Sequence, residues 1–265
     1  MNLKNMKIRL PMYFIGLFIM TIGIALSVKS NLGVSPVSSI PYTMTCIWGI
    51  EMGKATIIFH IVLVFIQFLL LRKNFKLITL LQIPVGVIFG YFTTFCNYLA
   101  SFFPTPDNLI VRILMVLASS VIVAVGIFLY LPADVIPLAG EGVMSAVSQV
   151  TKIEFSKIKM GFDITMVVVS AAACLIMIHS LGSVGAGTVI AAFLVGFILG
   201  IINKAFGKYR DKLLKKTLSV QVDKKTDDEQ NPTYVITVSR EYGSGGRQIA
   251  KHLPKVLGLS ITITS

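Results

Sequence analysis

Charged residues are scarce in this sequence. They make up 14% of its 265 residues, whereas hydrophobic residues make up 55% and the mean hydropathy is +0.82. A soluble domain carries about 25% charged residues. This shortage of charge, together with repeated apolar runs of about 18 residues or more, excludes an ordinary soluble domain. It predicts an all-α polytopic membrane protein.

Cysteine is also rare and forms no pattern. Cys46, Cys96 and Cys174 each lie alone in an apolar segment, and no C-x-x-C motif occurs. No other metal-ligand spacing and no Ser/His/Asp nucleophile pattern stands out. The sequence therefore predicts no metal site and no catalytic residue.

Acidic residues are outnumbered, with 12 Asp and Glu against 24 Lys and Arg, which gives a net charge of +12. The basic residues cluster in short loops at the ends of apolar runs and in the segment after Phe206. This distribution is typical of membrane topology signals rather than of a nucleic-acid surface. The expected partner is the lipid bilayer of the cell membrane, and nucleic acid is excluded.

Six long apolar runs are separated by shorter, weaker ones. The long runs fall near residues 10–28, 55–71, 77–100, 110–131, 160–179 and 185–203. Two weaker segments, near 33–50 and 134–150, are interrupted by Pro36, Pro41, Pro132 and Pro137. Proline removes a backbone donor and kinks a helix. Irregular backbone of this kind survives in a bilayer only when it is buried in protein or faces a water-filled cavity.

The two halves of the apolar region match each other. "GIAL" at Gly23 corresponds to "GIFL" at Gly126, 103 positions later, and "GKATIIFHI" from Gly53 corresponds to "SKIKMGFDI" from Ser156 at the same offset. After a short insertion, "GVIFGYF" from Gly86 matches "GFILGII" from Gly196. The membrane domain thus covers residues 1–206, with repeat 1 at about 7–103 and repeat 2 at about 110–206. Such repeats are typical of transporter folds.

The number of spans depends on whether the broken segments cross the bilayer. If they do not, there are six spans in two inverted sets of three, and both termini are cytoplasmic. If both cross, there are eight spans and the repeats become parallel. The positive-inside rule favours six, mainly because six spans place Arg72, Lys73 and Lys76 in the cytoplasm.

Four residues are candidates for a transport site. His60 and Asp163 occupy equivalent positions in the two repeats, where an ionisable group inside a bilayer is often functional. In the inverted arrangement they lie near opposite membrane faces, so each would control one entrance. Ser35 and Glu141 lie in the broken segments, which either expose helix N-termini to a cavity or are kinks packed between helices.

The membrane part resembles the YczE/YitT-like bacterial membrane proteins over about residues 7–205. The resemblance is carried by "LGVSPVSSIPY", "MGKATIIFHIVLVFIQFLLLRK", "LLQIPVGVIFGYF", "PLAGEGVMSAVS", "KIKMGFDITMVVVS" and "GAGTVIAAFLVGF". It implies a membrane family without implying an activity.

A short α/β P-loop-like fragment is expected at the C-terminus, because a β-rich run precedes a glycine-rich turn. Residues 207–231 are expected to be a cytoplasmic linker, first basic and then polar. From residue 232 to about 259 the chain resembles the start of cytidylate kinase-like proteins, so 232–265 is expected to be a truncated fragment of such a domain. The resemblance implies phosphate binding by a set of loop residues. These are Ser239, Arg240, Gly243, Ser244, Gly245, Gly246 and Arg247.

Three functions remain open at this stage. The first is a transporter or permease for a small-molecule solute. The second is a membrane-anchored nucleotide phosphotransferase using ATP or another nucleotide, although the lysine of the G-x-x-x-x-G-K-[ST] pattern is absent. The third is a membrane sensor that does not transport. The oligomeric state is left open.

Overall fold

The computed structural model describes residues 6–214, 220–225 and 233–238. These residues form two units, divided between Lys208 and Tyr209. In the first unit, the described residues form helices joined by loops.

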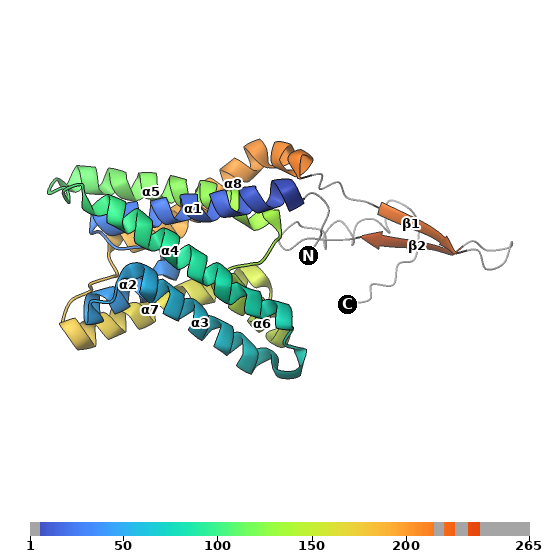
Figure 1. Ribbon diagram of the computed structural model, residues 1–265, viewed down its shortest axis with the longest axis horizontal. Coiled ribbons are helices and arrows are strands. Elements are labelled where there is room, and N and C mark those ends of the chain that lie inside the picture. Colours follow the sequence, from blue (N-terminus) through green and yellow to red (C-terminus); the bar gives the residue numbers. More distant parts are fainter. Residues whose placement is uncertain (1–5, 215–219, 226–232, 239–265) are drawn as a thin grey trace. The chain divides into compact units, whose positions relative to one another are not determined.

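Six long helices and two short ones make up this first unit (Figure 1). The long helices are α1 (Met6–Ser30), α3 (Met52–Leu71), α4 (Gln82–Ser101), α5 (Leu109–Tyr130), α7 (Phe155–Ile178) and α8 (Ala186–Leu213), whose last residues belong to the second unit. The short helices are α2 (Pro36–Trp48) and α6 (Ala139–Thr151). Single 3₁₀ turns are η1 (Arg72–Asn74), η2 (Leu77–Leu81) and η3 (Leu131–Ala133).

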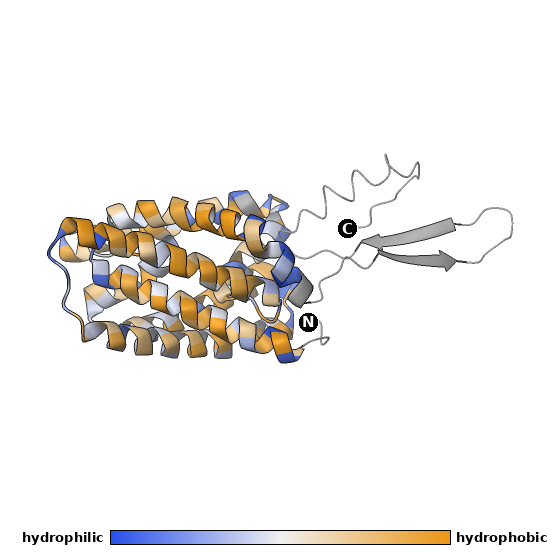
Figure 2. Cartoon of the chain, turned by 90° about the horizontal axis from the view of Figure 1, so that it is seen from above, coloured by the Kyte–Doolittle hydropathy of each residue, from blue (hydrophilic) through white to orange (hydrophobic). Residues whose placement is uncertain are grey.

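The described part of the chain holds six candidate membrane spans, judged by length and composition. The two short helices correspond to the predicted broken segments and have 13 residues each. Such a helix is about 20 Å long, whereas the hydrocarbon core of a bilayer is about 30 Å thick. Each short helix is therefore too short by itself to cross this core. Figure 2 shows the apolar character of the long helices, with hydrophilic residues gathered toward their ends.

The first helices of the two repeats, α1 and α5, pack closely along each other (Figure 1). Glycine permits this approach. A Cβ atom on Gly16 would lie 2.8 Å from the carbonyl oxygen of Gly126, and one on Gly23 would lie 2.9 Å from that of Ser119. Small residues allow helix backbones to approach closely in membranes. The pair α1–α5 therefore joins the two repeats through backbone contact.

Each short helix packs against the third helix of the other repeat. Helix α2 lies on α7, where Ser39 donates a hydrogen bond to the carbonyl oxygen of Met166 at 3.2 Å. Helix α6 lies on α3, where Gln67 donates to the carbonyl oxygen of Ala139, also at 3.2 Å. The two repeats are thus interleaved. Neither repeat's short helix has its main partner within its own half.

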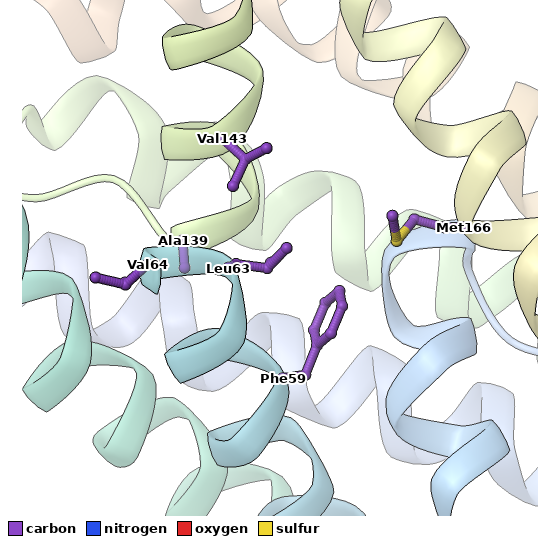
Figure 3. Packing of buried hydrophobic residues seen from close by; sticks show 6 residues of the cluster. All are labelled: Phe59, Leu63, Val64, Ala139, Val143 and Met166. Carbon is purple, nitrogen blue, oxygen red and sulfur yellow. The ribbon is translucent and has the colours of Figure 1, made fainter. Parts of the chain in front are cut away.

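An apolar cluster fills the space where α3, α6 and α7 meet. Its buried members, drawn in Figure 3, are Phe59, Leu63, Val64, Ala139, Val143 and Met166. Ile40 of α2 packs against the cluster from the remaining side. The four helices α2, α3, α6 and α7 therefore share one dry core.

The second unit contains the last turn of α8 and a β-hairpin. Strand β1 (Val220–Lys225) pairs antiparallel with β2 (Thr233–Val238). The β-rich run before the glycine turn forms strand β2. Part of the segment expected to be a polar linker is also a strand, because Val220 and Val222 alternate with polar residues and can pair with the apolar residues of β2. The glycine loop lies outside the described residues, and so do all seven phosphate-binding candidates.

Candidate functional site

Polar side chains gather where each short helix begins. One group surrounds Glu141 in the first turn of α6, and the other surrounds Ser35 before the first turn of α2. Ser38 is the residue equivalent to Glu141, because the two lie 103 positions apart. The two groups are therefore the same place in the two repeats.

Glu141 is held by hydrogen bonds from the end of α5 and from the connecting loop. The Tyr130 hydroxyl donates to Glu141 Oε2. The backbone N–H of Leu138 is shared, at 3.1 Å from Glu141 Oε2 and 2.6 Å from the Tyr130 hydroxyl oxygen. Next to this group, the Tyr13 hydroxyl donates to the carbonyl oxygen of Ile136 at 2.7 Å. The carboxyl group thus ties α6 to α5, while α1 holds the loop between them.

The pKa of the Glu141 carboxyl group lies close to neutral pH. Glu141 lies outside the six candidate spans, in the short helix α6, and is half-buried. Burial raises the pKa of Glu141 to about 7, while the hydrogen bonds from Tyr130 and Leu138 and the positive charge of Lys159 oppose that rise. Burial disfavours a charged carboxylate, whereas hydrogen bonds to it and the N-terminus of a helix favour it. The side chain can therefore gain or lose a proton near pH 7.

The group around α2 is built from hydroxyls and contains no carboxylate among its described members. Ser35 donates to Ser38 Oγ at 3.2 Å. Ser170 donates to Ser39 Oγ at 2.9 Å, and Thr43 and Ser183 share a hydrogen bond of 2.6 Å. These hydroxyls satisfy one another and nearby carbonyls. This neighbourhood is therefore a neutral helix–helix contact.

His60 and Asp163 are equivalent in sequence but have different surroundings. His60 is buried and stacks on Phe89, with ring centroids 5.7 Å apart and an interplanar angle of 7°. Asp163 forms an ion pair with Lys159 of its own helix at 3.0 Å. Each keeps one buried atom without a hydrogen-bond partner, His60 Nδ1 and Asp163 Oδ1.

The four predicted transport residues are thus brought together only in part. Asp163 and Glu141 share Lys159, which pairs with the first and acts electrostatically on the second. No described hydrogen bond or ion pair links His60 or Ser35 to Glu141. The described groove beside Phe68, Leu69, Arg72 and Lys73 includes none of the four.

Two glutamines form hydrogen bonds between helices. Gln67 donates to Gln82 Oε1 at 2.8 Å and to the carbonyl oxygen of Ala139 in α6 at 3.2 Å. Asn97 donates to the carbonyl oxygen of Thr93 within its own helix. The structure adds three residues that the sequence reading missed, Arg9, Tyr13 and Tyr130. The repeat could have pointed to Arg9, because Arg112 lies 103 positions after it, at the offset of the repeats.

Comparison with known proteins gives the family. Residues 7–204 match the model of a family of unknown function, DUF6198. The chain belongs to this family. The uncharacterized membrane protein YczE of Bacillus subtilis (strain 168) is 24% identical over 197 residues, which are 74% of this chain and 86% of that protein. The expected YczE-like membrane family is therefore confirmed.

Two limits of these matches bear on function. No solved structure matches the chain. The family match ends at residue 204 and so does not include the glycine loop or the strand before it. The resemblance to cytidylate kinase-like proteins receives no support from these comparisons.

Proposed function

We propose that the membrane unit is a transporter or permease for a small-molecule solute, coupled to protons through Glu141. The observation that carries the proposal is the pair of short helices exchanged between two repeats, one of which begins at a half-buried carboxyl group. Discontinuous helices at the interface of repeats are typical of transporter sites. An ionisable group in such a place is a functional candidate by default.

The proposed chemistry follows from the surroundings of Glu141. A carboxyl group with a pKa near 7 accepts a proton from one side and releases it to the other if its exposure changes. The Tyr130 hydroxyl and the Leu138 N–H hold the deprotonated form while the proton is away. On the neighbouring helix α7, Lys159 supplies a positive charge, which is itself paired with Asp163.

The proposed topology places the protein in the cell membrane with both termini in the cytoplasm. The basic residues at Lys7, Arg9, Arg72, Lys73 and Lys152 then lie on one face, as the positive-inside rule requires. The alternative of a membrane-anchored nucleotide kinase rests on residues 239–259. These lie outside the described residues and outside the family match, so the membrane unit carries the proposal.

Flux measurements in proteoliposomes test this function. Vesicles with a trapped pH-sensitive dye are challenged with amino acids, nucleosides, organic acids and polyamines, and internal pH is followed. A transported solute should change internal pH in wild type. Glu141→Gln should abolish this change, because an amide cannot exchange a proton, while Ser38→Ala at the equivalent position should retain it. Equal proton movement in wild type and Glu141→Gln would contradict the assigned coupling.

A further inference from the structure

Each repeat begins its first helix with an arginine that faces the far end of the other first helix. Arg9 is near the start of α1, and Arg112, 103 positions later, is near the start of α5. Their facing residues are equivalent too, because Asn31 follows α1 and Asp134 follows η3 at the same offset. Both of these residues have a φ of 52°. The antiparallel pair α1–α5 therefore carries one arginine site at each end.

The site at the Arg112 end is closed. Arg112 Nε donates to the carbonyl oxygen of Ser30 at 2.7 Å, and its Nη2 donates to that of Asn31. A guanidinium group suits this role, because its planar fork reaches two acceptors at once. Carbonyls at a helix C-terminus lack partners within the helix and attract positive charge. Arg112 thus fixes the end of α1 to the start of α5.

The site at the Arg9 end lacks these hydrogen bonds. The Arg9 side chain is only 5% exposed, yet its Nε and Nη1 have no hydrogen-bond partner. Arg9 forms only an ion pair with Asp134, whose Oδ2 lies 3.8 Å from Nη1, beyond hydrogen-bonding distance. A buried guanidinium with unused donors is unfavourable. The equivalent site at Arg112 shows that backbone carbonyl oxygens at the end of the facing helix would satisfy these donors.

Glycine contacts lie between the two arginine sites. Gly16 meets Gly126, and Gly23 meets Ser119, so the two backbones touch along this part of the pair. Two rigid helices that touch in the middle can rock, and rocking closes one end while it opens the other. Sliding would change both ends alike, because they are related by the repeat.

We propose that Arg9 and Arg112 are alternately engaged latches, so that engagement of one accompanies release of the other. The structure holds the state in which Arg112 is engaged. In the other state, Arg9 binds the end of α5 at Ala133 and Asp134, and Arg112 leaves Ser30 and Asn31. This inference rests on the proposed transport function, for which the two states would be the two open directions.

Distances at the two ends of α1–α5 test the latches without any solute. Spin labels are placed at Leu10→Cys and Leu131→Cys for the Arg9 end, and at Val28→Cys and Ile113→Cys for the Arg112 end. The two pairs are equivalent, since each label has its counterpart 103 positions away. Leu10, Leu131 and Ile113 are exposed and Val28 is half-buried. The background replaces Cys46, Cys96 and Cys174 by Ala in the full chain, in nanodiscs.

Reciprocal change is the expected result. Arg112→Gln should lengthen the distance at its own end and shorten the distance at the Arg9 end, with the ratio of the two states changing about tenfold, as removal of charged hydrogen bonds predicts. Arg9→Gln should remove the alternate state from both distributions. Lys29→Gln, a nearby charge outside the latches, should change neither.

A change confined to the mutated end would overturn the proposal, because each arginine would then be a local support only. Unchanged distances at both ends would overturn it as well. Retained size-exclusion profiles of the cysteine-free protein and of each labelled variant establish folding. Flux is measured separately. Reciprocal distances without transport of any solute would refute the transport function and leave the latches standing.

Discussion

The last two helices of each repeat, α3–α4 and α7–α8, are equivalent. Helices α4 and α8 carry glycines at matching positions, but these glycines have different surroundings. In repeat 1, a Cβ atom on Gly86 of α4 would lie 2.7 Å from His60 Nδ1. In repeat 2, Gly196 and Gly200 of α8 have the same spacing, and a Cβ atom on either would meet nothing within 4 Å in the described structure. The glycine of α4 is packed against a neighbouring helix, whereas the glycines of α8 lie on an open surface of the described structure. Glycine spacing therefore permits close helix packing but does not impose it.

The difference extends to the residues that face these glycines. His60 fits between Gly86 and Phe89, where it is buried. Its equivalent, Asp163, turns to Lys159 on its own helix instead. Helix α8 exposes Phe193 and Phe197 by 78% and 67%, as expected of a surface covered by lipid. The repeats thus share a sequence pattern while only one of them forms a tight hairpin.

The sharpest test of this comparison fills each glycine site with a large side chain. Gly86→Leu should destabilise the fold by about 3 kcal/mol or more, because His60 is confined and overpacking forces backbone shifts. Gly196→Leu should change stability by about 0.5 kcal/mol or less, as for an exposed position. Thermal unfolding in detergent measures both. Equal losses would mean that α8 packs as α4 does.

The next test compares Glu141 with its equivalent, Ser38, as a function of pH. In the native state the pKa of Glu141 is raised to about 7 from 4.5. Native protein therefore binds this proton more tightly than unfolded protein, and stability falls as pH rises from about 4.5 to 7. The loss is on the order of 3 kcal/mol once pH exceeds the native pKa.

Unfolding midpoints between pH 5 and pH 8 should show this dependence in wild type and in Ser38→Ala. The dependence should be weaker in Glu141→Gln, whose amide does not titrate. Parallel curves for wild type and Glu141→Gln would show that Glu141 does not carry the titration.

Hydropathy and repeat matching predicted much of the fold. They gave the six candidate spans and the two interruptions. They did not predict that α2 and α6 exchange between repeats, because hydropathy identifies apolar segments and not their partners. The exchange depends on contacts such as Ser39 with Met166, between residues far apart in sequence.

The candidate site was less predictable for a related reason. Glu141 was identified as a candidate from its place beside Pro137 and Gly140. Its partner Tyr130 was not, because Tyr130 ends a different helix and a hydroxyl at the end of an apolar run does not indicate what it will contact. Likewise, Arg112 binds the backbone carbonyl oxygens of Ser30 and Asn31. Acceptors on the backbone are the same for every residue type, so the sequence does not mark them.

A smaller difference is expected where the exchanged helices are hydrogen-bonded. Gln67, on α3, contacts α6 at the same place where Ser170, on α7, contacts α2, and the two residues are 103 positions apart. Gln67→Leu should cost about 2 kcal/mol, because it leaves buried Gln82 Oε1 without its donor. Ser170→Ala should cost about 1 kcal/mol, since Ser39 keeps its bond to Pro36. A larger loss for Ser170→Ala would reverse this ranking of the two contacts.

The smallest effect is expected at Ser35, which precedes α2. Its hydroxyl donates to Ser38 at 3.2 Å in a half-buried position, and water can replace that bond. Ser35→Ala should therefore lower stability by about 0.5 kcal/mol. Removing the corresponding bond in repeat 2, with Glu141→Ala, should cost several times more, because the Tyr130 hydroxyl and the Leu138 N–H lose a buried acceptor. Unfolding midpoints of the two variants at pH 5, below the raised pKa of Glu141, measure the ratio. Equal losses would mean that the two short helices are held alike in spite of their different chemistry.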